Sequence, residues 1–268
     1  LSIRRQRQMC IRDRMMYETA FRREVDALLE QADRPMRETK AGVLQVQRNK
    51  TIRVVLKGRL PKGVYAKDII LYLAGLLGAN GANYKALEFC GDGVATLSVE
   101  ERMTITNMVI ELGGKCGLMP CDDTLREWLH GRVEGEIEGV AADDDAVYCQ
   151  TVEVDLDKLC PQVAKPHKVD NVSPIAEVEG TPVQHAIIGT CTNGRIEDLE
   201  VAARILDGKK IAHGMTLTIS PASKAVYIEA IHRGYVETFL RAGATIAIPG
   251  CSGCSGGAYA VSYTHLTL

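Results

Sequence analysis

The sequence is poor in aromatic residues and close to neutral in charge. Aromatic side chains make up 5% of the 268 residues, and the formal net charge is −2. A surface that binds nucleic acid needs an excess of Lys and Arg or aromatic rings that stack on bases, so we expect no nucleic-acid partner. Nor does any apolar run approach the roughly 20 residues that cross a bilayer. We therefore expect no membrane partner either.

The chain also lacks the features of a small secreted protein. Its Arg-rich beginning has no apolar segment behind it, so it does not have the pattern of a secretory signal. The nine cysteines are scattered rather than set in the tight framework of a disulfide-rich domain. We therefore expect a reducing, cytoplasmic location.

Both ends of the sequence resemble the translation of a sequencing adapter, the second in reverse complement. We expect residues 1–14 and 261–268 to be adapter-derived and exclude them from the fold, which makes the chain a fragment of a longer protein. Residues 15–50 are charged and helical in pattern, and we leave them unassigned. One interpretation is a chimeric junction near Lys50.

The sequence pattern of residues 51–160 is typical of an α/β domain. Ser98 and Glu101 form the sequence signature of a capping box, which predicts the start of a helix that runs to about Leu112. Gly78 ends an earlier stretch of apolar residues at helical spacing. In this region we predict strands over residues 52–56, 87–89, 95–97 and 151–156, and helices over residues 69–77, 98–112 and 123–130.

Four prolines between residues 161 and 182 predict an extended linker to a second domain, residues 183–260, which we expect to be truncated. There, predicted strands over residues 185–188, 216–219 and 245–248 alternate with helices that we expect to be capped by Asn193 and Ser223. Alternation of this kind favours a parallel sheet, in which ligands bind outside the carboxyl ends of the strands. The predicted fold class is therefore α/β, with parallel or mixed sheets flanked by helices in two partial domains.

Three cysteines lie just beyond two of these strand ends. Cys191 stands in Gly-Thr-Cys-Thr-Asn-Gly, and Cys251 and Cys254 stand in Gly-Cys-Ser-Gly-Cys. Soft thiolate ligands suit iron–sulfur clusters, and the small residues around them let the backbone approach a cluster closely. Three ligands instead of four leave one metal position open for chemistry. The residues alone leave two alternatives: a structural zinc site and a redox dithiol.

The remaining cysteines have simpler interpretations. Cys116 and Cys121 are separated by four residues, which is a spacing that a second metal pair could use. Small buried hydrophobic residues are the interpretation we favour for both, and for Cys90, Cys149 and Cys160.

The sequence resembles the aconitase family over about residues 51–258, and within it the isopropylmalate dehydratase and homoaconitase branch. The resemblance rests on several separate motifs that occur in the family's order. They are Gly-Arg-Leu at 58–60, Ala-Lys-Asp-Ile-Ile-Leu at 66–71, Arg-Met-Thr-Ile-Thr-Asn-Met-Val-Ile-Glu at 102–111, Gly-Thr-Cys-Thr-Asn-Gly-Arg at 189–195, and Gly-Cys-Ser-Gly-Cys at 250–254.

The resemblance implies an aconitase-like fold and a cofactor. In the family, three cysteines, which match Cys191, Cys251 and Cys254, hold one 4Fe-4S cluster per subunit with one open iron. Asn107 and Glu111, four residues apart on one predicted helix and so on one face, match family residues that lie close to that iron. The implied activity is dehydration and rehydration of a small hydroxy-di- or tricarboxylic acid.

The implied reaction is the interconversion of 2-isopropylmalate and 3-isopropylmalate in leucine biosynthesis, together with a separate small subunit that carries a swivelling domain. Homocitrate or citrate as substrate, and a metal or redox module without catalysis, are the alternatives. The chain has no match to the family's Asp-His, Asp-Ser-His and Asn-Arg motifs. We therefore expect the chain by itself to be a poor catalyst or none.

Overall fold

The computed structural model describes residues 50–250 except 136, 138 and 191. The chain divides into two compact units, of which the first is Asn49–Pro182 and the second includes all described residues from Val183 onward. Each unit has its own sheet and its own apolar core. None of the helices in the described part of the chain is long and apolar enough to cross a bilayer.

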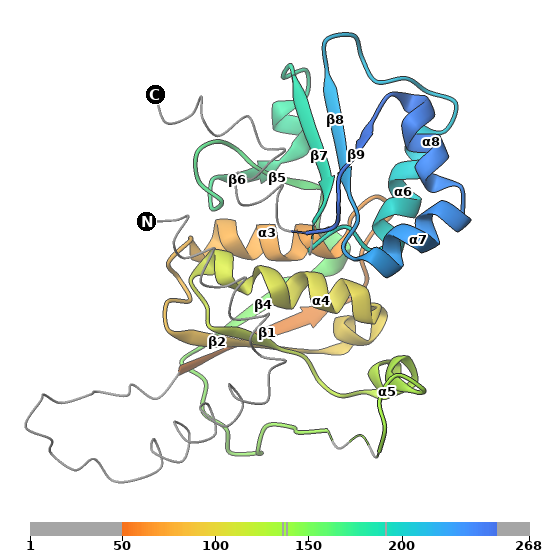
Figure 1. The fold of residues 1–268 in the computed structure, drawn as a ribbon. Helices are drawn as coiled ribbons and strands as arrows, with labels where there is room; N and C mark the ends of the chain where they lie inside the picture. Colours follow the sequence, from red (N-terminus) through yellow and green to blue (C-terminus); the bar gives the residue numbers. More distant parts are fainter. Residues whose placement is uncertain (1–49, 136, 138, 191, 251–268) are drawn as a thin grey trace, which may run out of the picture. The chain divides into compact units, whose positions relative to one another are not determined.

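The first unit is built on a four-stranded parallel sheet in the order β3-β2-β1-β4 (Figure 1). Its strands are β1 (Lys50–Lys57), β2 (Lys85–Cys90), β3 (Cys116–Leu118) and β4 (Gln150–Asp155). The central strand β1 alternates in burial, with Ile52, Val54 and Leu56 fully buried and the residues between them more exposed. That alternation matches a sheet with one face packed on the core.

Two helices lie side by side on the packed face of this sheet, α3 (Ala66–Leu77) and α4 (Val99–Met108) (Figure 1). The helix α3 ends at Gly78, as predicted, and the Ser98–Glu101 capping box is present, with the Glu101 amide donating to Ser98 Oγ at 3.2 Å and the Ser98 amide donating to Glu101 at 2.8 Å. The helical path continues as the 3-10 turn η2 (Val109–Leu112). The predicted helix over 98–112 is thus confirmed in extent, although its last turn is tighter than an α-helix.

One predicted strand in this unit is wrong. Residues 95–97 were expected to be extended, but the 3-10 turn η1 (Asp92–Thr96) occupies this stretch. A Cβ on Gly93 would lie 2.9 Å from the Leu56 carbonyl carbon, so the chain passes too close to β1 for a side chain there. The turn is closed by Thr96 Oγ1, which donates to the Gly93 carbonyl at 2.7 Å. This tertiary packing outweighs the local preference for a strand.

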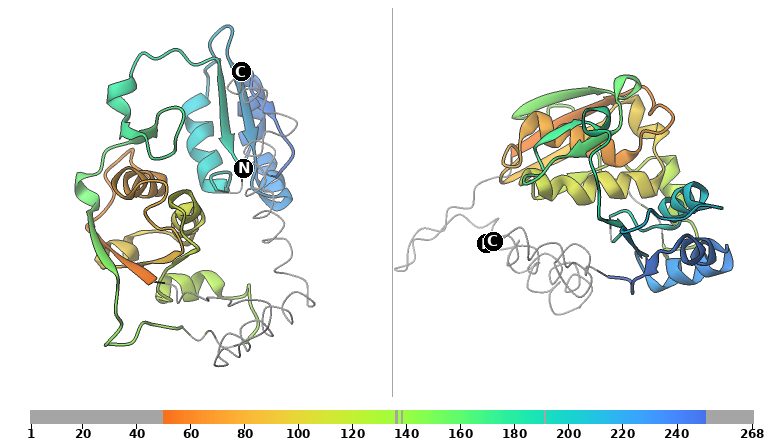
Figure 2. Two further views of the ribbon diagram at one scale, coloured as in Figure 1. Left: turned by 90° about the vertical axis from the view of Figure 1, so that its left-hand side faces the viewer. Right: turned by 90° about the horizontal axis from the view of Figure 1, so that it is seen from above.

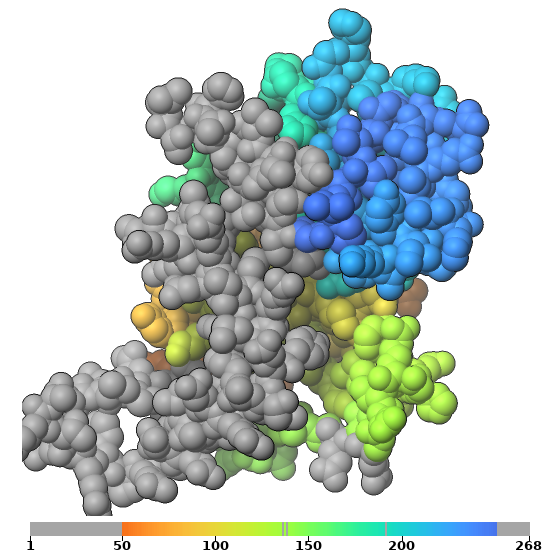
Figure 3. Space-filling view, viewed as in Figure 1, coloured from red at the N-terminus to blue at the C-terminus, as the bar shows by residue number. Residues whose placement is uncertain are grey.

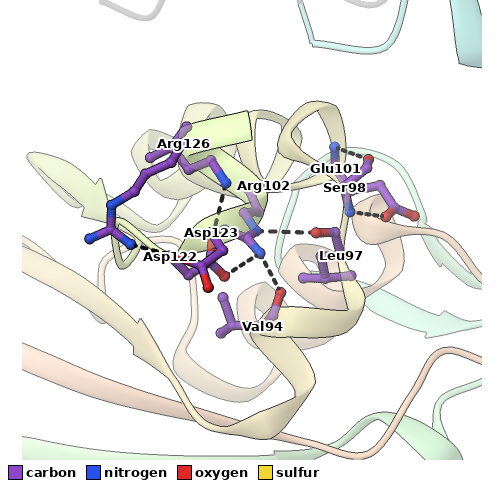
Figure 4. A network of polar contacts seen from close by, with 9 residues as sticks. Val94, Leu97, Ser98, Glu101, Arg102, Asp122, Asp123 and Arg126 are labelled. Atoms are coloured by element: carbon purple, nitrogen blue, oxygen red, sulfur yellow. Dashed lines mark hydrogen bonds and ion pairs between the residues drawn. The ribbon is translucent and has the colours of Figure 1, made fainter. Parts of the chain in front are cut away.

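A buried arginine joins the elements around α4 (Figure 4). The guanidinium of Arg102 donates to the Leu97 carbonyl at 3.2 Å and the Val94 carbonyl at 3.0 Å. It also donates to both carboxylate oxygens of Asp122 at 2.7 Å. Asp122 caps α5 (Asp123–Leu129) by accepting from the Leu125 amide at 3.1 Å. The helix α5 has no buried residue and lies at the surface (Figure 3), so this network and the hydrogen bond from Trp128 Nε1 to Glu100 at 2.6 Å attach it to the first unit.

Residues 161–182, expected to be an extended linker, contain regular structure. The 3-10 turn η3 (Leu156–Lys158) precedes them, and the segment itself holds an antiparallel pair, β5 (Gln162–Ala164) and β6 (Val172–Pro174), and the turn η4 (Ile175–Val178). Asp68 of α3 accepts from the Gln162 amide at 2.7 Å. The segment is therefore part of the first unit.

The second unit has a three-stranded parallel sheet in the order β7-β8-β9. Its strands are β7 (His185–Gly189), β8 (Thr216–Ser220) and β9 (Thr245–Ile246), and its helices are α6 (Ile196–Leu206), α7 (Lys224–His232) and α8 (Tyr235–Ala242). The parallel sheet was predicted, and β9 is shorter than the predicted strand over 245–248.

The three helices lie on one face of the sheet (Figure 2). Their apolar residues join one core with alternate residues of the sheet. From the sheet, this core includes Ala186, Ile188, Leu217, Ile219 and Ile246. In register, Ile188 pairs with Ile219, and Ile219 pairs with Ile246, so these side chains share one face. The residues between them, including Ser220, belong to the opposite face.

Candidate metal centre

The carboxyl edge of the β7-β8-β9 sheet is where the predicted ligands leave their strands. Cys191 follows the last residue of β7 by two positions, and Cys251 follows the last residue of β9 by five. Cys191, Cys251 and Cys254 themselves lie outside the described residues. In this sheet β8 alone separates β7 from β9, so the two strands are two spacings, or about 10 Å, apart.

The end of β8 is hydrogen-bonded to both cysteine-bearing segments. On one side, the Thr190 amide donates to the Ser220 carbonyl at 2.9 Å, and the Ala222 amide donates to the Gly194 carbonyl at 2.8 Å. On the other side, the Ala247 amide donates to the Ile219 carbonyl at 2.8 Å. Residues on both sides of Cys191 are therefore anchored to residues 220–222, and the segment that leads to Cys251 is anchored next to them.

The backbone at this edge is packed too closely for larger residues. A Cβ on Gly194 would lie 2.5 Å from the Ser220 carbonyl oxygen and 2.6 Å from that of Thr190. Gly189, with φ of +111°, has no room either, because a Cβ would collide with the Ser220 carbonyl oxygen. Thr190 has φ of 89°, which is rare for a β-branched residue. Strained backbone of this kind is concentrated at ligand and active sites.

Two buried polar atoms at this edge lack a hydrogen-bond partner within the described ranges, namely Asn193 Oδ1 and Ser220 Oγ. Most buried polar atoms in proteins are paired, and exceptions need an explanation such as a ligand. Small residues, close backbone packing and the unpaired Ser220 hydroxyl, which can donate to a sulfur, together fit an iron–sulfur cluster at this edge. The residues present are therefore compatible with the cluster that the sequence predicted.

Asp198 fixes the path of the chain from this edge into α6. Its two oxygens accept from Asn193 Nδ2 at 3.1 Å and from the Arg195 amide at 3.0 Å. Asn193 was predicted to cap the helix, but the cap position is Arg195. The prediction was wrong because Asp198 binds both residues, so the helix begins two positions later than expected. Glu197 and Asp198 lie in the first turn of α6, where the helix dipole favours acidic residues.

Asn107 and Glu111, the predicted catalytic residues, both belong to the first unit. Asn107 lies in the last turn of α4, and Glu111 lies in η2; both are exposed. Although part of the Glu111 side chain is exposed, the protein around its carboxyl desolvates that group enough to raise its pKa, and the positive charge of Lys67 opposes this effect. A carboxyl with a raised pKa is a common feature of acid–base sites, although structural groups show it too. The roles of these two residues stay predictions.

The other described cysteines do not match their predicted burial. Cys116, Cys149 and Cys160 are exposed, and Cys90 and Cys121 are partly buried. Cys90 accepts a hydrogen bond from Arg53 Nε at 3.3 Å on the sheet face opposite α3 and α4. The edge strand β3 leaves Cys116 open to solvent, which local pattern does not reveal. Across the described ranges, no three His, Cys, Asp or Glu side chains are grouped so that they could hold a metal ion.

Comparison with protein families identifies the chain's relatives. The model of the aconitase family (aconitate hydratase) matches residues 39–180 and 176–262. The match begins within residues 15–50, the segment that sequence reasoning left unassigned. Together the two ranges cover both units.

Curated relatives match over 77% of the chain. The 3-isopropylmalate dehydratase large subunit 2 of Archaeoglobus fulgidus is 51% identical over 208 residues, which are 50% of its own length. A probable methanogen homoaconitase large subunit of Methanosarcina mazei is 48% identical, over 52% of its length. The chain thus spans about half the length of the curated relatives it matches. Among solved structures, the aconitase X of Thermococcus kodakaraensis aligns with a TM-score of 0.41 at 17% identity, over 78% of this chain and 45% of that one.

Proposed function

The chain belongs to the aconitase family, and we propose that it is part of an iron–sulfur hydro-lyase that interconverts 2-isopropylmalate and 3-isopropylmalate in leucine biosynthesis. The observation that carries this proposal is the placement of the cysteine-bearing segments. Both leave the same edge of one parallel sheet, from strands that only β8 separates. Ligand sites of open α/β sheets lie at such edges.

In this proposal Cys191, Cys251 and Cys254 hold one 4Fe-4S cluster. Such a cluster, when bound through three cysteines, supplies an open iron that acts as a Lewis acid toward a substrate hydroxyl group. The protein's own contribution is to fix the loops. The hydrogen bonds from Thr190 to Ser220 and from Ala222 to Gly194 hold both ends of the first loop against β8.

Asn107 and Glu111 are the proposed substrate-side residues. The Glu111 carboxyl holds its proton to higher pH than an ordinary glutamate because desolvation raises its pKa. That shift brings the group closer to the range in which a carboxyl exchanges protons efficiently with a bound substrate or water. The amide of Asn107 can both donate and accept, which suits the orientation of a water molecule or a hydroxyl group.

The proposed partner is a separate small subunit. Relatives with 47 to 51% identity carry names that describe them as large subunits. The proposed substrate is a small hydroxy-di- or tricarboxylic acid. The complete protein, rather than this chain alone, is the expected catalyst.

The test of the cofactor is anaerobic reconstitution of the chain with iron and sulfide. We expect a broad visible absorbance that Cys191→Ser, Cys251→Ser and Cys254→Ser each abolish or strongly reduce. The matched control is Cys116→Ser, which removes an exposed thiol of the first unit and is expected to leave the absorbance unchanged.

Two outcomes contradict the proposal. If zinc binds and no chromophore forms, the chain holds a structural metal site. If Cys116→Ser reduces the chromophore as much as Cys191→Ser does, the iron is bound non-specifically and the assignment of the three cysteines is wrong.

A homoaconitase is the second candidate, because a relative described as a probable methanogen homoaconitase large subunit is 48% identical. The two candidates differ in substrate, so the full-length protein from the source gene, combined with its small subunit, should be assayed with 3-isopropylmalate and with homocitrate. Formation of the unsaturated acid from isopropylmalate alone supports the first candidate. Turnover of homocitrate alone supports the second.

A further inference from the structure

Ser220 stands at the centre of the carboxyl edge described above. It is the last residue of β8, it pairs in register with Gly189 of β7, and it is 1% exposed. Its carbonyl accepts from Thr190, the residue before Cys191. Its hydroxyl, by contrast, has no hydrogen-bond partner among the residues that the structure describes.

We propose that the Ser220 hydroxyl donates a hydrogen bond to a sulfur atom of the iron–sulfur cluster, and so acts as a positioning residue that tunes the cluster. This inference rests on the proposed function, since it requires the cluster to be bound at this edge. A buried hydroxyl without a partner is unfavourable, so a ligand that accepts its proton removes that cost. Cluster sulfurs are acceptors, and hydrogen bonds to them are a main determinant of cluster potential.

The position of Ser220 favours a sulfur as its acceptor. The Thr190 amide donates a hydrogen bond to the Ser220 carbonyl. Across one trans peptide, the Cα atom of Cys191 is about 3.8 Å from the Cα atom of Thr190. Ala247 precedes Cys251 by four residues, and its amide donates a hydrogen bond to the carbonyl of Ile219, the residue before Ser220. Ser220 therefore lies between the starting points of both cysteine-bearing segments, and its side chain belongs to the sheet face opposite the helices.

The other unpaired atom at this edge cannot take the same role. Asn193 Nδ2 already donates to Asp198 at 3.1 Å, and the atom without a partner is the carbonyl oxygen Oδ1. An amide oxygen only accepts, and a thiolate or sulfide has no hydrogen to give it. Of the two unpaired atoms, the Ser220 hydroxyl alone can donate to a sulfur.

The experiment uses the reconstituted 268-residue chain and four variants. Ser220→Ala removes the hydroxyl. Ser220→Thr and Ser220→Val form a pair of equal size that differ in the hydroxyl, so any effect of added bulk is common to both. Ser173→Ala is the matched control, because Ser173 is also buried at 6% exposure with an unpaired hydroxyl, but it lies on β6 of the first unit.

We expect Ser220→Ala to assemble the chromophore and to have a more negative midpoint potential in a redox titration. A hydrogen bond to sulfur stabilises the more negatively charged reduced cluster, so its loss lowers the potential. The chromophore should also bleach in air about fivefold faster, the factor that an ordinary hydrogen bond supplies. Ser220→Thr should resemble the wild type more than Ser220→Val does, and Ser173→Ala should match the wild type.

A potential and a bleaching rate unchanged in Ser220→Ala, with a normal chromophore in the wild type, overturn this inference and leave the proposed function intact. No chromophore in the wild-type chain overturns both. Equal shifts in the Thr and Val variants also overturn the inference, since bulk and not the hydroxyl would then be responsible. Thermal unfolding of each variant checks that the fold is retained.

Discussion

Removal of the Asp122 carboxylate is expected to destabilise the first unit far more than removal of its neighbour, Asp123. The Arg102 side chain is 4% exposed, and Asp122 accepts two hydrogen bonds of 2.7 Å from it. In Asp122→Ala the guanidinium stays buried with only the carbonyls of Val94 and Leu97 as acceptors. A buried charge that has lost its counter-charge is one of the few sources of large destabilisation.

The magnitude follows from two contributions. Breaking a fully buried ion pair costs about 3–5 kcal/mol, but Asp122 is 29% exposed and Arg102 keeps two acceptors, so about 2 kcal/mol is the better estimate. Loss of the cap that accepts from the Leu125 amide adds about 1 kcal/mol. The total is about 3 kcal/mol. With a urea slope of about 2 kcal/mol per molar for a unit of this size, the midpoint should fall by about 1.5 M.

The assay is urea unfolding followed by the fluorescence of Trp128, the single tryptophan of the chain. Trp128 lies on α5, where Nε1 donates to Glu100 at 2.6 Å, so it reports directly on the attachment of this helix. The control is Asp123→Ala, which breaks an exposed pair with Arg126 at 3.0 Å and should cost less than about 0.5 kcal/mol. Equal midpoints for the two variants would refute the reasoning.

The same pair gives a dependence on pH with a defined sign. Hydrogen bonding from Arg102 lowers the pKa of Asp122 below its ordinary value, although desolvation opposes this effect. The native state therefore binds fewer protons than the unfolded state at acid pH. The stabilisation is present above the ordinary pKa of aspartate and is lost as the pH falls through the lowered value. In Asp122→Asn this part of the acid-induced loss of stability should disappear.

Two further predictions concern Glu111 and Gly194. Because desolvation raises the pKa of Glu111, the native state holds its proton to higher pH than the unfolded state does, and stability falls as the pH rises through the raised value. Glu111→Gln should remove this decline in urea titrations that start at the ordinary pKa of glutamate and continue to neutral pH, and it should lower turnover in the complete enzyme. Gly194→Ala places a Cβ 2.5 Å from the Ser220 carbonyl oxygen and should cost about 1–3 kcal/mol by circular dichroism. A loss of less than about 0.5 kcal/mol in Gly194→Ala would contradict the packing argument.

The parts of the fold that local chemistry determines were predictable. The Ser98–Glu101 box and the stop at Gly78 depend on residues within one turn, and both occur in the structure. The 3-10 turn at Asp92–Thr96 was not predictable, because it results from the contact of Gly93 with β1, about 37 residues away in the sequence. The start of α6 shows the same limit, since the preference of Asp198 for two partners overrides the capping tendency of Asn193.

The strands that lead to the candidate site were predictable from the sequence. The residues that lie behind the proposed ligands, such as Ser220, were not. Alternating strands and helices were enough to predict that the segments leading to Cys191 and Cys251 leave one sheet edge, because parallel strands share a carboxyl end. Ser220 gives no comparable signal, since serine before proline is common at the end of a strand. Its relevance depends on the order β7-β8-β9, which inserts β8 between the two cysteine-bearing strands, and on burial of its hydroxyl without a partner in the described residues. Strand order and burial are properties of the tertiary structure, so local sequence does not reveal them. A search for polar residues at the end of any strand that lies between two ligand-bearing strands would therefore extend the sequence method to such positions.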